Sequence, residues 1–298
     1  MDPCARMSLP LPAIDDVEGL RLPEGLPPVV DAHVHVFPDR VFDAMWRWFD
    51  RHAWPVRYKL YARQVLRFLL DRGVERIVAL HYSHAPGMAR VLNAFVAELC
   101  REEPRITGLA TVLPGEPDAA AILAEAFAMG LAGVKIHCHV QCVGPDDASL
   151  APVYEACVRE DLPLVMHAGR EPKSDAYRCD PHAICSADRV ASVLAAHPRL
   201  RLVVPHLGSD EYAAYEGLLE RFDNLWLDTS VAAADYFPVP VPPRIWTVRP
   251  DRILYGTDFP NLPYAWDREL GKLVELGLRP DDLERIVGGN ATKLFTRD

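Results

Sequence analysis

The feature that most constrains the fold of this chain is a repeated alternation of short apolar runs with helical segments. Each run is almost continuously hydrophobic, as expected for strands buried on both faces. The runs that predict strands lie at 29–35, 75–81, 105–112, 133–137, 162–167, 200–206, 224–228 and 252–258. Alternating β and α units predict a parallel sheet, and eight of them in a chain of 298 residues predict a (β/α)8 TIM barrel. A doubly wound open sheet is the alternative, but no Gly-x-Gly-x-x-Gly motif follows the first strand.

Two segments flank the first predicted strand. Residues 1–28 are rich in proline, leucine and acidic residues without a sustained period, so we expect an N-terminal arm packed outside a single barrel domain at 29–298. Residues 40–66 crowd aromatic side chains, and Pro55 divides them into two helical pieces. One interpretation of this helical insertion is a crossover helix that packs its apolar face on the barrel. The alternative is a cap over a site or a subunit interface, since aromatic residues favour both.

Composition excludes several classes of function. The net charge of −10 argues against a nucleic-acid-binding surface and against a patch that binds membranes. No apolar run approaches the roughly 20 residues that span a bilayer, and residues 1–11 lack the apolar core of a secretory signal. The seven cysteines are odd in number and scattered, which is typical of reduced thiols. We therefore expect a cytoplasmic protein with a small-molecule substrate.

Histidine, lysine and aspartate residues stand where the predicted strands end. In a barrel, the carboxyl ends of the strands meet at one mouth, which is where barrel enzymes carry their active sites. His33 and His35 alternate on the first strand, so both imidazoles would face one side and form half of a site for a divalent metal. Asp31 would share that face. The strand-end residues are His33, His35, Lys135, His137, His167, His206, Asp228 and Asp258.

The histidine and aspartate motifs at the strand ends resemble those of a known family. His33-x-His35, His167, His206 and Gly256-Thr-Asp258-x-Pro260 are similar to the metal site of the amidohydrolase superfamily, in the order of its strands. The closing segment Gly289-Asn290-Ala-Thr-Lys-Leu-Phe295 resembles the C-terminal helix of its amidohydrolase-related branch, a group of metal-dependent TIM-barrel hydrolases and decarboxylases. The resemblance extends from about residue 29 to residue 296.

The resemblance implies a role for each of these residues. His33, His35 and His167 would bind one divalent metal ion, most often zinc, with Asp258 as a further ligand and proton acceptor. The metal would activate a water molecule whose proton Asp258 takes. His206 would polarise the substrate carbonyl or bind a second metal. Lys135 would either be carbamylated and bridge two metals or contact substrate; we expect one metal, with two as the alternative.

Two further motifs are open to more than one interpretation. His137-Cys138-His139 with Cys142 looks like a small zinc cluster, but the spacing is tighter than in zinc fingers. Strand alternation would put Cys138 on the face opposite His137, so we expect His137 or His139 to line the mouth and contact substrate. Arg170 is expected to bind an anionic substrate; its alternative is a surface ion pair with Glu171 or Asp175.

Three functions fit this pattern. The first expectation is a metal-dependent hydrolase acting on the carbonyl of a small, anionic amide, ester or lactone. The same ligands would serve a metal-dependent decarboxylase or hydratase of an aromatic or unsaturated acid. The third is a non-catalytic metal-binding barrel. The acid predicted beside the metal argues against it, because a scaffold does not need one. A homodimer is compatible with the family and with the aromatic segment at 40–66.

Overall fold

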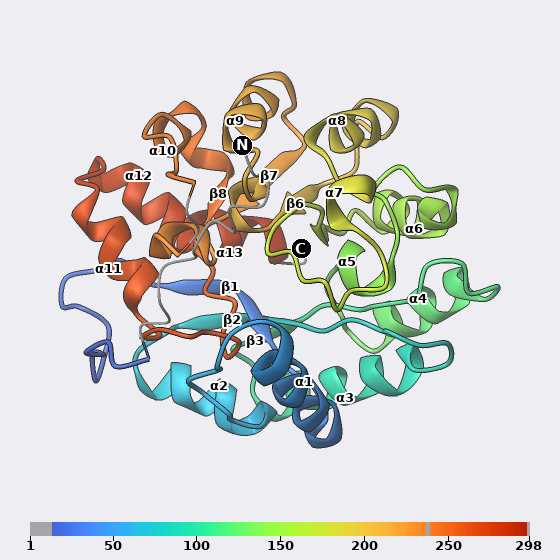
Figure 1. The fold of residues 1–298 in the computed structure, drawn as a ribbon, viewed down its shortest axis with the longest axis horizontal. Helices are drawn as coiled ribbons and strands as arrows, with labels where there is room; N and C mark the ends of the chain where they lie inside the picture. Colours follow the sequence, from blue (N-terminus) through green and yellow to red (C-terminus); the bar gives the residue numbers. More distant parts are fainter. Residues whose placement is uncertain (1–13, 237–238, 297–298) are drawn as a thin grey trace, which may run out of the picture.

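The computed structural model of the protein describes residues 14–236 and 239–296, so the first 13 residues of the expected N-terminal arm lie outside the described part. Figure 1 shows the strands set around a common centre with the longer helices outside them. The strands are β1 (Val30–His35), β2 (Arg76–Leu80), β3 (Ile106–Gly108), β4 (Val134–His137), β5 (Leu164–His167), β6 (Leu202–Val204), β7 (Leu225–Asp228) and β8 (Ile253–Leu254).

All strand pairs are parallel and follow the order of the chain. They form a three-stranded sheet, β1-β2-β3, and a five-stranded sheet, β4 to β8. Isolated bridges join the two sheets at both seams, Ala110 with Val134 and Val34 with Phe259. At the second seam, the His35 amide donates to the Phe259 carbonyl at 2.7 Å. The fold is the predicted (β/α)8 TIM barrel.

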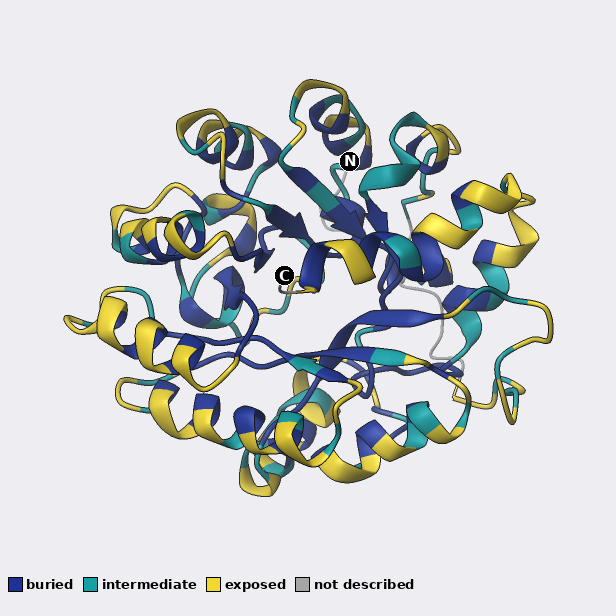
Figure 2. Ribbon diagram, turned by 180° about the vertical axis from the view of Figure 1, so that it is seen from behind, coloured by how far each residue is buried: buried dark blue, intermediate teal, exposed yellow. Residues whose placement is uncertain are grey.

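The helices lie between the strands and after the last one. They are α1 (Asp39–His52), α2 (Ala62–Asp71), α3 (Ala89–Glu102), α4 (Ala119–Ala128), α5 (Cys138–Gln141), α6 (Ala151–Glu160), α7 (Pro181–Ile184), α8 (Ala187–Ala196), α9 (Tyr212–Arg221), α10 (Ile245–Val248), α11 (Arg268–Glu275), α12 (Pro280–Glu284) and α13 (Asn290–Phe295). Figure 2 shows them with buried inner and exposed outer faces. None of the described helices has the length and apolarity needed to cross a bilayer.

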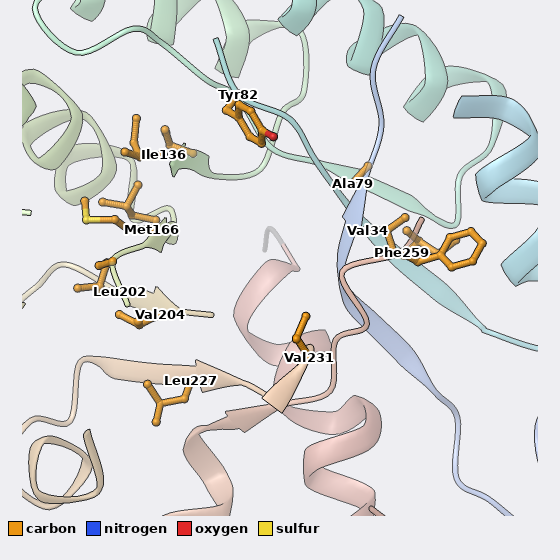
Figure 3. Packing of buried hydrophobic residues seen from close by; sticks show 14 of the residues in the cluster. Val34, Ala79, Tyr82, Ile136, Met166, Leu202, Val204, Leu227, Val231 and Phe259 are labelled. Carbon is orange, nitrogen blue, oxygen red and sulfur yellow. The ribbon is translucent and has the colours of Figure 1, made fainter. Parts of the chain in front are cut away.

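The apolar residues form two buried clusters, one on each side of the strands. The smaller cluster joins strand residues such as Val30, Val165 and Val203 to Leu294 and Phe295 of α13, which therefore closes the barrel interior at one end. The larger cluster lies between the strands and the outer helices. Figure 3 shows part of it, with side chains from β1, β2 and β4 to β7. At the carboxyl ends of the strands, buried polar residues such as His33, His35 and His167 take the place of this apolar packing.

Two features of the strands differ from the sequence-based expectation. The pairing register shifts between Asp31 and Val34, and Ala32 packs in the inner cluster whereas Val34 packs in the outer one. This irregularity reverses the alternation, so Asp31 does not share a face with His33 and His35 as the regular strand predicted. The third and eighth strands are also shorter than predicted, because their carboxyl ends leave the hydrogen-bonded ladder early.

The described part of the arm packs on the outside of the barrel near α11. The indole of Trp266 donates to the Gly19 carbonyl at 3.0 Å, and Arg57 donates to the Asp16 carbonyl at 2.9 Å. These contacts link the arm to the segment that follows α1 and to the last βα loop. Neither contact involves a histidine at the strand ends.

Gly208, just after β6, provides a test of the fold near the site. Its φ is +84°, and a Cβ there would meet the ring of Tyr215 at 2.0 Å. We expect Gly208→Ala to lower the free energy of unfolding by about 3 kcal/mol, from overpacking and the left-handed backbone together. At Gly217 in α9, an added Cβ would have nothing within 4 Å, so Gly217→Ala should instead stabilise by about 0.5–1 kcal/mol. Denaturant unfolding of both variants measures the contrast; equal effects would contradict it.

Candidate metal centre and substrate cavity

Three side chains from opposite ends of the sequence converge at the mouth of the barrel. His35 Nε2 lies 2.8 Å from Asp258 Oδ1, and His33 Nε2 lies 3.4 Å from the same oxygen. The two imidazole Nε2 atoms are 3.2 Å apart. The β1–β8 seam produces this arrangement, since the Asp258 amide donates to the His33 carbonyl at 2.9 Å. Asp258 adopts a left-handed φ of 68°, which turns the chain sharply after β8.

Asp228, at the end of β7, fixes the orientation of His33. Its Oδ2 lies 2.7 Å from His33 Nδ1, so we assign the ring proton to Nδ1 and a lone pair to Nε2. The other oxygen of Asp228 accepts hydrogen bonds from the Ser230 hydroxyl and from the His206 amide. Burial lowers the pKa of His33 to about 4, so the ring is neutral. A neutral imidazole held in this tautomer has the form that binds a metal.

His206 and His167 form a hydrogen-bonded chain beside this group. His206 Nδ1 donates to the Ser230 carbonyl at 2.9 Å, which leaves a lone pair on its Nε2. That nitrogen lies 3.1 Å from His167 Nδ1, so His167 donates and keeps a lone pair on its own Nε2. Both ring nitrogens of His206 are therefore engaged. His206, two residues after the end of β6, also has a left-handed φ of 59°, and its ring stacks on His33 at a centroid distance of 5.4 Å.

The structure divides the predicted metal ligands between two groups. In the described residues, one group that could hold an ion is His33, His35 and Asp258, and the other is His137, His139 and His167. Within each group the ligand atoms lie within 4.8 Å of one another. His167, implied by the resemblance as a ligand beside His33 and His35, is thus grouped with the histidines of β4 and α5.

The two charged residues predicted to contact substrate, Lys135 and Arg170, do not line the cavity beside the histidines. Lys135 is fully buried in β4, its amino group has no hydrogen-bond partner among the described residues, and it does not line the cavity. Burial lowers the pKa of Lys135 to about 8. Arg170 also lies outside the cavity: its guanidinium donates to Asp210 at 2.8 Å and approaches Glu211 at 3.4 Å. Arg170 therefore forms its ion pairs with Asp210 and Glu211, rather than with Glu171 or Asp175.

A cavity of about 620 Å³ lies over both histidine groups. Residues of helix α1 and of the segment after it, which belong to the predicted insertion at 40–66, form much of its wall. Trp48 of α1 meets Tyr177 of the loop after β5 at a ring-centroid distance of 5.2 Å. The aromatic side chains of the wall are Trp48, Phe49, Trp54, Tyr82 and Tyr177, and its cationic ones are Arg40, Lys173 and Arg178.

Some of these residues had no assigned role in the sequence-based interpretation. Asp228 was recognised only as a polar strand end, although a carboxylate that closes a buried strand beside a histidine site is a signal for an orienting group. Ser230 and Tyr177 lie in loops, and nothing in the sequence pattern singles them out. Asp31 is a satisfied buried acid: it accepts hydrogen bonds from the His33 amide and, at 2.7 Å, from the Thr257 hydroxyl, while burial raises its pKa to about 7.

The donor set at His33, His35 and Asp258 suits a divalent transition-metal ion. Two imidazoles and one carboxylate are the ligand types that such ions take from proteins. His33 already presents a lone pair at Nε2, and the Asp258 carboxylate lies against the Nε2 atoms of both rings. The three groups therefore offer their ligand atoms to one small space, and an ion there would bind all of them.

Comparison with known proteins identifies the family. The family model for amidohydrolase matches residues 30–297, which is nearly all of the chain. A search of curated proteins found no sequence that matches.

Solved structures agree on the fold. An uncharacterized TIM-barrel protein from Bordetella bronchiseptica is 20% identical with a TM-score of 0.70, covering 89% of this chain and 97% of its own. The 5-carboxyvanillate decarboxylase from Novosphingobium aromaticivorans, in complex with manganese and 4-hydroxy-3-methoxy-5-nitrobenzoic acid, is 17% identical with a TM-score of 0.65, covering 94% and 99%. The 2,6-dihydroxybenzoate decarboxylase from Rhizobium is 16% identical with a TM-score of 0.62, covering 91% and 99%.

Proposed function

We propose, from the premise that this chain belongs to the amidohydrolase family, that it is a metal-dependent decarboxylase of a small aromatic or unsaturated carboxylic acid. The observation that carries this proposal is the single cavity that joins His35 and Asp258 to a wall of aromatic side chains. Hydrolysis was the first expectation from the sequence. The aromatic wall and the decarboxylases among proteins of the same fold shift our preference.

His33, His35 and Asp258 would hold the metal ion, with Asp228 keeping His33 in the required tautomer. A divalent ion supplies Lewis-acid stabilisation of negative charge on the substrate. Zinc is the metal that the family resemblance implies, and manganese is the metal in the decarboxylase from Novosphingobium aromaticivorans. The proposal requires one divalent ion at this group and leaves its identity to metal analysis.

The cavity wall suits a flat substrate. Trp48 and Tyr177 approach each other at a tilt of 33°, and Tyr82 meets the His137 ring edge-on at 4.8 Å. Aromatic faces of this kind favour stacked and edge-to-face contacts with a planar ring. Burial raises the pKa of both Tyr82 and Tyr177, so these hydroxyls stay neutral and act as hydrogen-bond donors or acceptors rather than as bases.

Asp258 is our candidate for the proton carrier. Its side chain is 14% exposed, which leaves it accessible from the cavity. In each turnover, protonated Asp258 delivers its proton to the carbon that carries the carboxylate, the carbon–carbon bond breaks, and CO2 leaves. Asp258 then recovers a proton from solvent, so one carboxylate and one proton become one C–H bond and one CO2. His35, at 2.8 Å, holds the carboxyl group in position.

One observation favours hydrolysis as the second candidate. Burial acts to raise the pKa of Asp258, but the hydrogen bond with His35 and the neighbouring imidazoles outweigh it, so the pKa lies below its usual value. A carboxylate that stays ionised is suited to take a proton from water, as hydrolysis of an ester, amide or lactone requires. The two candidates share their ligands and differ in the fate of the substrate.

A product assay separates the two candidates. The protein is loaded with Zn²⁺ or Mn²⁺ and incubated with hydroxylated benzoic acids, unsaturated dicarboxylic acids and, in parallel, lactones and esters. We expect metal-dependent release of CO2 and uptake of one solvent deuterium at the carbon that lost it. Ring opening of a lactone without CO2 release would establish the hydrolase instead. No turnover of either class by the loaded protein would count against both.

Arg178 supplies a prediction about substrate charge. It lines the cavity, and no described residue forms an ion pair with it. We expect it to bind a second anionic group of the substrate, so Arg178→Ala should raise KM about 10- to 100-fold with a smaller change in kcat. Lys173→Ala is the control, because the Lys173 amino group is already paired with Asp180 at 2.9 Å. Equal KM values for the two variants would contradict this assignment.

A further inference from the structure

The His137-Cys138-His139 motif is not used by the site at His33, His35 and Asp258. In the structure, His137 is the last residue of β4, and α5 begins at the very next residue, Cys138. This switch from strand to helix brings the rings of His137 and His139 to a centroid distance of 5.5 Å. Cys138 is buried in the outer apolar cluster and does not join them.

Gln141 holds this turn in place. Its side-chain oxygen accepts a hydrogen bond from the His137 amide at 2.9 Å, and its amide nitrogen donates to the Ser83 and Val112 carbonyls at 2.8 and 2.9 Å. Those carbonyls belong to the loops after β2 and β3. The two histidines are therefore fixed relative to the barrel rather than carried on a free loop.

His167 completes the group from the neighbouring strand. It is the register partner of His137 in the β4–β5 pair, and the two rings stack at 4.2 Å with an interplanar angle of 10°. The His139 ring meets His167 edge-on at 4.4 Å. All three side chains are buried, the most exposed of them at 8%. Three imidazoles from β4, α5 and β5 thus enclose one small space.

The hydrogen bonds around the three rings leave lone pairs that have no partner. His139 Nε2 donates to the Gly169 carbonyl at 2.7 Å, so its Nδ1 carries a lone pair. His167 donates from Nδ1 to His206, so its Nε2 carries one. His139 Nδ1, His167 Nε2 and His137 Nδ1 are all buried without a hydrogen-bond partner in the described part of the chain. A carbonyl that orients the far side of the ring is the usual support of a metal-binding histidine.

We propose that His137, His139 and His167 form a second metal site, which binds a divalent transition-metal ion such as Zn²⁺ next to the His33–His35–Asp258 group. Three imidazole ligands select zinc, cobalt or copper over magnesium and calcium, which prefer oxygen ligands. All three histidines line the cavity, so an ion that they hold would be accessible from the substrate space. The site uses neither Lys135 nor His206, the residues that the sequence suggested for a second metal.

A direct test is to locate zinc in crystals of the full-length protein grown with Zn²⁺, from diffraction measured on either side of the zinc absorption edge. We expect two anomalous peaks per chain, one of them bounded by His137, His139 and His167. A single peak shared by His33, His35, His167 and Asp258 would overturn the second site and leave the proposed function intact. A second peak at Lys135 and His206 would also overturn it. A lone peak at the three histidines would support the second site while contradicting the first.

A metal count in solution tests the same proposal without crystals. We expect the wild-type protein to retain about two Zn²⁺ per chain after desalting, and His139→Gln to retain about one, with an unchanged melting temperature of the metal-free form. His81→Gln is the matched control: His81 is equally buried and bonded to Asn93 at 3.0 Å, but it belongs to neither group. Equal zinc content in His139→Gln and the wild type would refute the proposal. Because the readout is bound metal, the result does not depend on which reaction the protein catalyses.

Discussion

Replacing Asp258 by asparagine should lower kcat about 10³-fold for whichever substrate the protein turns over. The asparagine side chain would keep the shape and one oxygen for the ion but could not carry a proton, and proton transfer by a placed side chain typically contributes about 10²- to 10⁴-fold. KM should change little, because the substrate carboxylate and ring would still bind the same cavity. The measurement is steady-state kinetics of Asp258→Asn, with activity expressed per metal-loaded chain.

The control for this prediction separates proton transfer from metal loss. His35→Ala removes a ligand of the same ion and the partner that lies 2.8 Å from Asp258. It should lose both metal and activity, and excess Zn²⁺ should restore part of each. Asp258→Asn should not recover activity at any metal concentration. Wild-type kcat in a fully loaded Asp258→Asn protein would remove Asp258 from the reaction.

Replacing Asp228 by alanine should weaken metal binding at the His33 group about 10- to 100-fold, the usual effect of removing a residue that orients a ligand. The carboxylate at 2.7 Å sets the His33 tautomer, and without it the ring proton can move to Nε2, the nitrogen that faces Asp258 and His35. The measurement is a competition titration of zinc against a chelator of known affinity. Dissociation constants for Asp228→Ala within about twofold of the wild type would contradict this role.

Asp228→Asn is the graded companion to that variant. Asparagine keeps an oxygen that can accept from His33 Nδ1 but has no charge, so the loss of affinity should be smaller than for alanine. Ser230→Ala removes a hydroxyl that contacts Asp228 and the same ring nitrogen at 3.2 Å while leaving the carboxylate in place. Its effect should be smaller still. The loss of zinc affinity should therefore decrease from Asp228→Ala to Asp228→Asn to Ser230→Ala, because Asp228 Oδ2 is the atom that keeps the proton on His33 Nδ1.

The sequence predicted the barrel well because each of its units has a local signal. Buried parallel strands are continuous apolar runs, and most of these runs end in a polar residue that lies at the carboxyl rim of the barrel. That rule alone brings His33, His35 and Asp258 together, although His35 and Asp258 lie 223 positions apart in the chain. The amidohydrolase resemblance rests on the same residues and is borne out by the family match over 30–297.

The details that the sequence could not supply depend on departures from regular geometry. A shift in register between Asp31 and Val34 reverses the alternation of β1, and apolar periodicity does not encode such a bulge. Helix α5 begins directly at Cys138, so His137 and His139 meet across a strand-to-helix turn rather than along a strand. Arg170 pairs with Asp210, a residue that is distant in sequence and brought close only by the β5 and β6 loops.

We propose that the reaction in the cavity requires a metal ion held by His33, His35 and Asp258. It is tested most directly by stripping the protein with a strong chelator, confirming the metal content by elemental analysis, and then measuring CO2 release before and after adding Zn²⁺ or Mn²⁺. We expect CO2 release to fall to the uncatalysed background and to return when the ion is restored. Undiminished CO2 release from metal-free protein would contradict it.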